Sequence, residues 1–178
     1  MTKNQRINLK SSFMKVIGVD PGYDKFGVAI LEKRGGFDEL IFSDCLRSSA
    51  KLPLSERMFI IGSEFDRIIK KYKPDTLAIE KLFFTTNQKT AMGVSEIKGV
   101  ATYIAKNNGL NTHEYTPLQV KMAIVGYGKA DKNQVSKMVP LLIKNFSKGE
   151  KKKMEDDEFD ACAVAITCLA IERQTVGK

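Results

Sequence analysis

Apolar residues recur along the chain with two spacings, one typical of strands and one typical of helices. Continuous or alternating apolar stretches rich in β-branched residues predict strands over residues 15–20, 27–33, 40–44, 76–82 and 112–115. Apolar residues three or four positions apart predict helices over residues 54–72, 88–106, 117–124, 131–146 and 159–173. Turns at residues 21–24 and 35–36 make the first three strands an antiparallel meander. This order predicts an α/β fold, with a mixed five-stranded sheet flanked by helices on both faces.

The length and the charge of the chain limit its architecture and its partners. At 178 residues it fits one domain, predicted over residues 14–173 between a flexible basic arm (residues 1–13) and a short tail (residues 174–178). The formal net charge is +8, and this excess of basic residues favours a polyanionic partner such as nucleic acid. On charge alone, a basic protein without such a partner is the alternative.

Several classes of protein are excluded or disfavoured by single features. The three cysteines form no CxxC pair, which indicates a reducing, cytoplasmic environment. His113 is the only histidine, so neither a histidine-rich zinc site nor a Ser-His-Asp triad can be built. No segment is long and apolar enough to cross a membrane, and residues 1–13 lack the apolar centre of a signal peptide.

Four carboxylates stand at the ends of three predicted core elements. Asp20 and Glu80 each end an apolar strand, and Asp157 and Asp160 lie near the start of the last helix. Desolvating an unpaired carboxylate is costly, so charges in such places need a partner. Hard divalent cations take oxygen ligands, and two such ions about 4 Å apart can catalyse phosphodiester hydrolysis. The sequence therefore predicts a metal-dependent site that acts on phosphodiesters.

Each of these acids also has a purely structural interpretation. Asp157 and Asp160 can favour the positive N-terminus of a helix, Glu80 can pair with a lysine, and Asp20 can belong to a turn. Individually the four signals are weak. Together, at the ends of three core elements, they favour the metal site.

Other features near the acids carry expectations of their own. Asp156 and Glu158 are expected to be solvated neighbours of the predicted site. The segment 20–22 with Gly27 also suits the acidic, glycine-containing hairpin of actin-type and heat-shock-type ATPases. Those proteins are far longer and need a second glycine-rich phosphate loop, which this sequence lacks, so the nuclease interpretation is preferred.

Four ordered motifs carry a resemblance to a known family. They are Asp20-Pro21-Gly22 with Gly27, Ala78-Ile79-Glu80 with Phe83 and Asn87, Gln119-Val120-Lys121 with the run from Gly126 to Val135, and Asp157-x-x-Asp160-Ala161. On these motifs the sequence resembles the RuvC family of Holliday junction resolvases over about residues 14–170. The resemblance implies the ribonuclease H-like fold.

The resemblance implies a role for each of the four acids. Asp20, Glu80, Asp157 and Asp160 would be the catalytic residues and would bind Mg²⁺, two ions per active site, with Mn²⁺ able to substitute.

Basic and aromatic residues are assigned by the same resemblance. Lys121 and Lys132 would be catalytic lysines that hold the scissile phosphate region, whereas without the family pattern they would be solvated surface residues. Phe83 would stack on an unpaired base near the crossover, and its alternative is core packing. Further DNA-binding residues are predicted at Asn87, Lys81, Lys98 and Lys129.

The predicted function is a magnesium-dependent endodeoxyribonuclease that resolves four-way junctions by paired symmetric nicks, leaving 5′-phosphate and 3′-hydroxyl ends. The family implies a homodimer, for which the helix over residues 88–106 is the candidate surface, and a branch-migration helicase as a possible partner. Lys81 beside Glu80, Ser95-Glu96 in place of Gly-Gln, and a lysine-rich linker depart from the family pattern. These departures keep two alternatives open, a broader phage-type branched-DNA nuclease and a junction-binding protein that does not cut.

Overall fold

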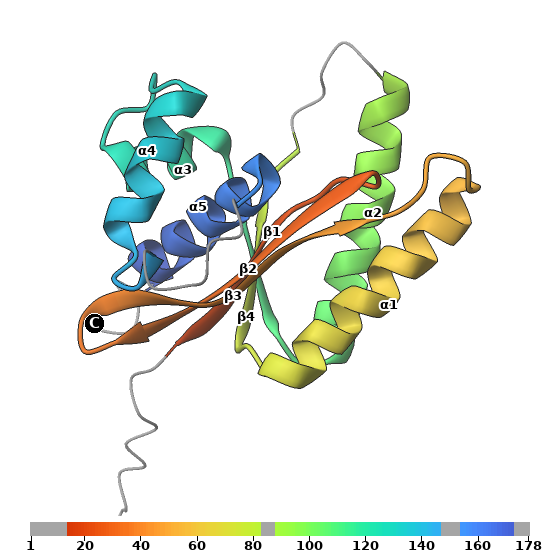
Figure 1. Cartoon of the computed structure of the whole chain (residues 1–178), viewed down its shortest axis with the longest axis horizontal. Helices are drawn as coiled ribbons and strands as arrows, with labels where there is room; N and C mark the ends of the chain where they lie inside the picture. The colour runs from red at the N-terminus through yellow and green to blue at the C-terminus, as the bar shows by residue number, and fades with distance from the viewer. Residues whose placement is uncertain (1–13, 83–87, 147–153, 173–178) are drawn as a thin grey trace, which may run out of the picture.

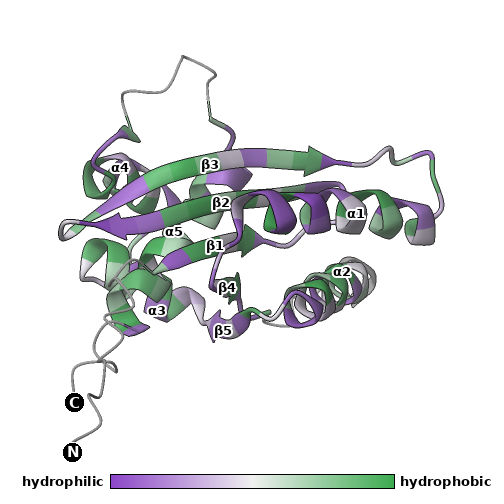
Figure 2. Cartoon of the chain, turned by 90° about the horizontal axis from the view of Figure 1, so that it is seen from below, coloured by the Kyte–Doolittle hydropathy of each residue, from purple (hydrophilic) through white to green (hydrophobic). Residues whose placement is uncertain are grey.

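The computed structural model describes residues 14–82, 88–146 and 154–172, and these form a five-stranded sheet with helices on both faces. The strands are β1 (Lys15–Asp20), β2 (Lys25–Arg34), β3 (Phe37–Arg47), β4 (Thr76–Glu80) and β5 (Asn111–Tyr115). Their order across the sheet is β3-β2-β1-β4-β5, which Figure 2 shows from top to bottom. Strand β2 is antiparallel to both neighbours and the other pairs are parallel, so the predicted mixed sheet is confirmed.

Two groups of helices cover the two faces of the sheet (Figure 1). On one face lie α1 (Leu54–Tyr72) and α2 (Gln88–Asn107), and on the other lie α3 (Pro117–Val125), α4 (Lys132–Leu142) and α5 (Asp156–Ile171). No helix in the part of the chain that the structure describes combines the length and the apolarity needed to span a membrane. The predicted arm lies outside the described residues.

Strand β1 divides its side chains between two hydrophobic cores. Ile17 and Val19 belong to the core under α1 and α2, whereas Val16 belongs to the core under α5. Because successive side chains of a strand point to opposite faces, Asp20 shares the face of Val16. The alternation therefore directs the last residue of β1 toward the helix α5.

Helix α5 approaches the sheet closely because two glycines lie beneath it. A Cβ at Gly18 would collide with the carbonyl oxygen of Ala161, and a Cβ at Gly27 would collide with that of Asp157. These two positions lie on neighbouring strands, since Gly27 pairs with Asp20 and Gly18 is two residues earlier on β1. The glycines thus fix both the height of α5 above the sheet and the place where it begins.

Two helix boundaries differ from the sequence prediction. Helix α4 was expected to continue to Phe146, but it ends at Leu142. The residues that follow bind the edge of β3 instead: Lys144 N donates to Asp38 O at 3.0 Å, and the Asn145 side chain bonds both backbone groups of Leu40. A local periodicity carries no information about such a distant partner.

The last helix begins three residues before its predicted start. It starts at Asp156 instead of Phe159, because the Glu155 backbone N–H is capped by the side chain of Glu158. The acids at 156–158 also favour the positive end of the helix.

Substitution of Gly18 tests the close approach of α5. Gly18→Ala should lower the free energy of unfolding by about 1–3 kcal/mol, because the added methyl forces the α5 backbone away from β1. Gly99→Ala is the matched control: Gly99 lies inside α2 and nothing approaches its position within 4 Å, so the change should stabilise by about 0.5–1 kcal/mol. Urea denaturation measures both, and equal effects of the two changes would contradict the packing argument.

Candidate active site

The first two predicted acids lie side by side at the carboxyl ends of two adjacent inner strands. Val19 of β1 pairs with Ile79 of β4 in parallel register, so Asp20 and Glu80 are the next residues on adjacent strands. Both point to the α5 face, because Val19 and Ile79 point to the core under α1 and α2. The structure therefore brings these two carboxylates together, as their positions at strand ends predicted.

The beginning of α5 carries the other two acids to the same place. The Asp157 carbonyl lies directly over Gly27, whose strand partner is Asp20. Asp160 follows three residues later on α5, and both carboxylates act on Asp20 through space. The four predicted acids thus come from three elements and converge at the carboxyl ends of β1 and β4.

Glu158 anchors the start of α5, which corrects the expectation that it is solvated. Its side chain is buried, with Oε2 accepting a hydrogen bond of 2.7 Å from Ser43 Oγ and Oε1 accepting one of 3.2 Å from the Glu155 backbone N–H. These bonds tie the first turn of α5 to strand β3. Asp156 is exposed, as expected.

Burial and mutual repulsion together raise the pKa values of two of the converging acids. Burial, followed by the charges of Asp160, Glu80 and Asp157, raises the pKa of Asp20 to about 7, although the charge of Lys132 acts to lower it. The pKa of Glu80 is also raised, chiefly by burial and then by Asp160. Carboxylates that destabilise one another in this way are stabilised by any cation that binds among them.

Two lysines from the helices beside α5 face the acids. Lys132 begins α4, and its Nζ lies 2.9 Å from Asp160 Oδ2; this contact raises the pKa of Lys132. Lys121 of α3 lowers the pKa of Glu80 through its charge, as Lys132 also does. The structure therefore places both predicted lysines within electrostatic reach of the acids.

A buried arginine that sequence reasoning missed holds the loop after Asp20. Arg57 of α1 donates to Tyr23 O at 3.0 Å and to Ser48 Oγ at 2.9 Å, and it forms an ion pair with Asp24. Its guanidinium lies 4.8 Å from the centre of the Tyr23 ring, and that ring occupies the space beside Gly93 of α2. A charged residue within the apolar stripe of an amphipathic helix was the available signal.

The remaining predicted DNA-binding residues occupy different environments. Lys81 and Lys129 are exposed, so their side chains are available at the surface. Lys98 is largely covered, with 13% of its side chain exposed, and its Nζ lies 2.9 Å from Glu114 Oε2. Phe83 and Asn87 lie outside the described residues, and the DNA-binding roles of all five residues stay predictions.

A second cluster of potential metal ligands adjoins the four acids. Ligand atoms of Cys45, Glu155 and Asp157 all lie within 4.8 Å of one another, and among the described residues no other group of three or more such side chains is as tight. Lys25 Nζ lies 3.7 Å from Asp157 and 3.8 Å from Glu155, which also pairs with Arg47. Burial, followed by the charges of Asp157 and Glu155, raises the pKa of the Cys45 thiol to about 11.

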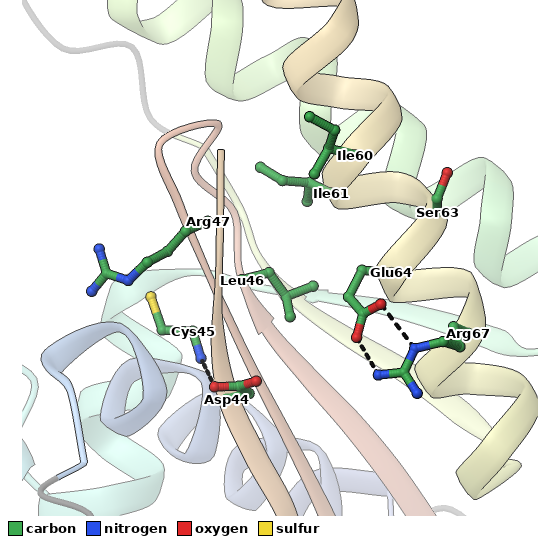
Figure 3. A pocket seen from close by; sticks show the side chains of 9 residues that line it. All are labelled: Asp44, Cys45, Leu46, Arg47, Ile60, Ile61, Ser63, Glu64 and Arg67. Atoms are coloured by element: carbon green, nitrogen blue, oxygen red, sulfur yellow. Dashed lines mark hydrogen bonds and ion pairs between the residues drawn. The ribbon is translucent and has the colours of Figure 1, made fainter. Parts of the chain in front are cut away.

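A pocket near this cluster is separate from the predicted site. It lies between β3 and α1, and the residues that line it include Leu46, Glu64 and Arg67 (Figure 3). None of the predicted catalytic residues lines it. Arg67 and Glu64, both on α1, form an ion pair with each other in the wall of this pocket.

Comparison with known proteins decides the family. The family model of the crossover junction endodeoxyribonuclease RuvC matches residues 16–168. The chain belongs to the RuvC family. A RuvC from Thermosipho melanesiensis is 43% identical over 159 residues, which cover 89% of this chain and 98% of the relative. Another from Alkaliphilus oremlandii is 44% identical over 153 residues, covering 86% of this chain and 91% of the relative.

A solved structure extends the agreement from sequence to fold. Thermus thermophilus RuvC in complex with a Holliday junction substrate superposes with a TM-score of 0.82 at 26% identity, covering 91% of this chain and 96% of that chain. The RuvC match confirms the predicted ribonuclease H-like fold.

The four predicted metal ligands at the carboxyl ends of β1 and β4 fit a hard divalent cation. All four predicted ligands are carboxylates, and burial, followed by the charges of neighbouring acids, raises the pKa values of Asp20 and Glu80. Mg²⁺ takes oxygen ligands and keeps several waters, so it needs only part of its coordination shell from the protein.

Substitution of Asp20 tests, through stability, the cost of ionising this buried carboxyl group. The folded-state pKa of Asp20 is raised, so the folded protein binds more protons than the unfolded chain between its ordinary value of 3.8 and about 7. Ionisation of Asp20 therefore costs stability as the pH rises through that window. Without divalent cations, Asp20→Asn should stabilise the protein by about 2–4 kcal/mol at about pH 8 and have little effect near pH 4.

Thermal unfolding with and without Mg²⁺ checks the prediction. Mg²⁺ should raise the Tm of the unmodified protein more than that of Asp20→Asn. Asp66→Asn is the control, because a hydrogen bond from Lys70 lowers the pKa of Asp66 and its loss should not stabilise. A lower Tm for Asp20→Asn at about pH 8 would show that ionised Asp20 does not destabilise the fold.

Proposed function

We propose that this chain is a crossover junction endodeoxyribonuclease that resolves four-way DNA junctions by hydrolysing phosphodiester bonds. The carrying observation is the convergence of acids from β1, β4 and α5 with Lys132, in a fold that superposes on a RuvC solved with a Holliday junction. The net charge of +8 supports a nucleic-acid substrate, since an excess of basic residues favours binding of a polyanion.

Asp20, Glu80, Asp157 and Asp160 would hold two Mg²⁺ ions, which Mn²⁺ can replace. When bound, such ions activate a water for attack on the phosphate and neutralise the charge on the leaving oxygen. Asp20 would be a central ligand, because the charges of the other three acids all act on it.

Two lysines of the chain would complete the site. Lys132 and Lys121 face Asp160 and Glu80, so a phosphate bound there replaces a carboxylate as their partner. Their charge would orient the scissile phosphate and stabilise the negative charge that grows on it during hydrolysis. Phe83 would stack on an unpaired base, and Asn87, Lys81, Lys98 and Lys129 would contact the strands.

Paired symmetric nicks need two such sites, so we propose a homodimer whose twofold axis matches the junction. Helix α2 is the proposed contact surface, and two of its large side chains support this, with Met92 exposed by 64% and Tyr103 by 71%. Cytoplasmic action beside a branch-migration helicase belongs to the same proposal.

A broader branched-DNA nuclease is the second candidate function. The departures Lys81, Ser95 and Glu96 favour it, because they alter residues beside Glu80 and within α2. A junction-binding protein that does not cut is disfavoured by the four acids, all present in the sequence.

Cleavage by an Asp20 variant tests the main proposal. Asp20→Asn should reduce magnesium-dependent cutting of a mobile synthetic junction by about 100-fold or more, because one of the four proposed metal ligands is lost. Junction binding in a gel-shift assay should survive. A linear duplex and a replication fork are run alongside; equal cutting of all three by the unmodified protein would favour the broader nuclease, and undiminished cutting by the variant would reject the site.

The role of Lys132 is tested on the same substrate. Lys132→Ala should slow single-turnover cleavage by about 100-fold while the junction Kd changes little, because the lysine stabilises charge that develops only during reaction. Lys137→Ala, an exposed lysine of the same helix, is the control and should leave the rate unchanged. Parallel losses in rate and affinity for Lys132→Ala would make it a DNA anchor only.

A further inference from the structure

The thiol of Cys45 lies beside the catalytic acids and has no role in the proposed reaction. Cys45 is 7% exposed, and its Sγ makes no hydrogen bond within the part of the chain that the structure describes. Figure 3 shows its sulfur directed away from α1, whereas the neighbouring Leu46 points toward it. A buried, unpartnered thiol is thus aimed at the start of α5.

The sheet register brings this thiol to Asp157. Cys45 pairs with Gly27 of β2, and the Asp157 carbonyl sits over Gly27. Glu155, two residues earlier, completes the group whose ligand atoms lie within 4.8 Å of one another. Because the contact at Gly27 and the Ser43–Glu158 hydrogen bond hold α5 against the sheet, the three ligands come from elements fixed relative to one another.

One thiolate and two carboxylates suit zinc and do not suit magnesium. Zn²⁺ binds sulfur at about 2.3 Å and carboxylate oxygen at about 2.0–2.2 Å, so tetrahedral ligands lie about 3.5 Å apart. Side-chain rotations that move the ligand atoms by about 1 Å would bring them to the separation that tetrahedral coordination needs. Mg²⁺ prefers oxygen ligands only, so sulfur discriminates between the two ions.

We propose that Cys45, Glu155 and Asp157 form a binding site for Zn²⁺, distinct from the predicted magnesium site and sharing Asp157 with it. On binding, the Cys45 thiol releases its proton to solvent and the thiolate coordinates the ion. Water fills the fourth position.

Lys25 and Arg47 compete with the ion for the carboxylates. Both pair with Glu155, and Lys25 also pairs with Asp157. Their side chains are 49% and 51% exposed, so each can turn into solvent when the ion binds, and exposed pairs of this kind stabilise little. Removing either cation should therefore tighten the site.

Sharing Asp157 makes zinc an inhibitor, and this consequence rests on the proposed function. Zn²⁺ on Cys45 and Glu155 draws the Asp157 carboxylate away from Asp20 and toward β3. The junction-cutting activity then loses one of its four acids while the fold is unchanged.

Direct binding is measured first, with the full-length protein and no DNA. Cd²⁺ replaces Zn²⁺ as the probe, because a cadmium–thiolate bond gives a near-ultraviolet charge-transfer absorption, and Zn²⁺ competes it away. One ion per chain is expected. Cys45→Ala should abolish the absorption, whereas Cys162→Ala and Cys168→Ala, which change cysteines in the fully buried core, should keep it.

Substitutions of the Glu155 carboxylate and of the competing Lys25 add two further measurements of binding. Glu155→Gln should weaken affinity at least about tenfold, since even residues that only orient metal ligands cost that much. Lys25→Gln should strengthen it. Circular dichroism confirms that each variant is folded, and absorption that persists in Cys45→Ala, or affinity unchanged by both Glu155→Gln and Lys25→Gln, overturns the site.

Inhibition is measured second, on a synthetic junction with Mg²⁺ in excess. Zn²⁺ should inhibit the unmodified protein, and Cys45→Ala should cut normally and resist Zn²⁺. Equal inhibition of both proteins overturns the shared role of Asp157. If no cutting occurs in Mg²⁺ alone, the proposed function fails, while the cadmium titration still decides the zinc site.

Discussion

The close approach of α5 to the sheet is the constraint on which the arrangement of the site depends. Gly18 and Gly27 leave room for the backbone of α5 at Ala161 and Asp157, so the first turn of the helix lies against the ends of β1 and β2. The acids of that turn are thereby held beside Asp20 by backbone packing and by the Ser43–Glu158 hydrogen bond, and not by contacts among the acids themselves. This matters because contacts among like charges could not hold them there.

The acids are arranged at the expense of stability. Asp20 is buried within reach of the charges of three other carboxylates, and burial followed by these charges raises its pKa to about 7. Lys132 relieves part of the repulsion by pairing with Asp160 from the start of α4. Repulsion among carboxylates that is only partly relieved is typical of sites that bind a cation, because the bound ion supplies the remaining positive charge.

The sequence predicted those features whose signals are local. The five strands, the sheet type and the position of Asp20 and Glu80 followed from apolar runs and their ends. The end of α4, the burial of Glu158 and the position of Cys45 did not, because each depends on a partner in β2, β3 or α5 that lies far away in the chain. Arg57 was missed for the same reason, since its partners belong to the loops around Tyr23 and Ser48.

Sheet register also explains how one helix start can face two kinds of ligand. The row Cys45–Gly27–Asp20 runs across three strands, and Glu80 follows on the fourth. Asp157 lies above the glycine in this row, with oxygen ligands on one side and a thiol on the other. Rotation of the Asp157 side chain therefore changes its partners from carboxylates alone to a thiol and a carboxylate. A residue larger than glycine at position 27 would displace Asp157 and move it away from the other acids and from the thiol.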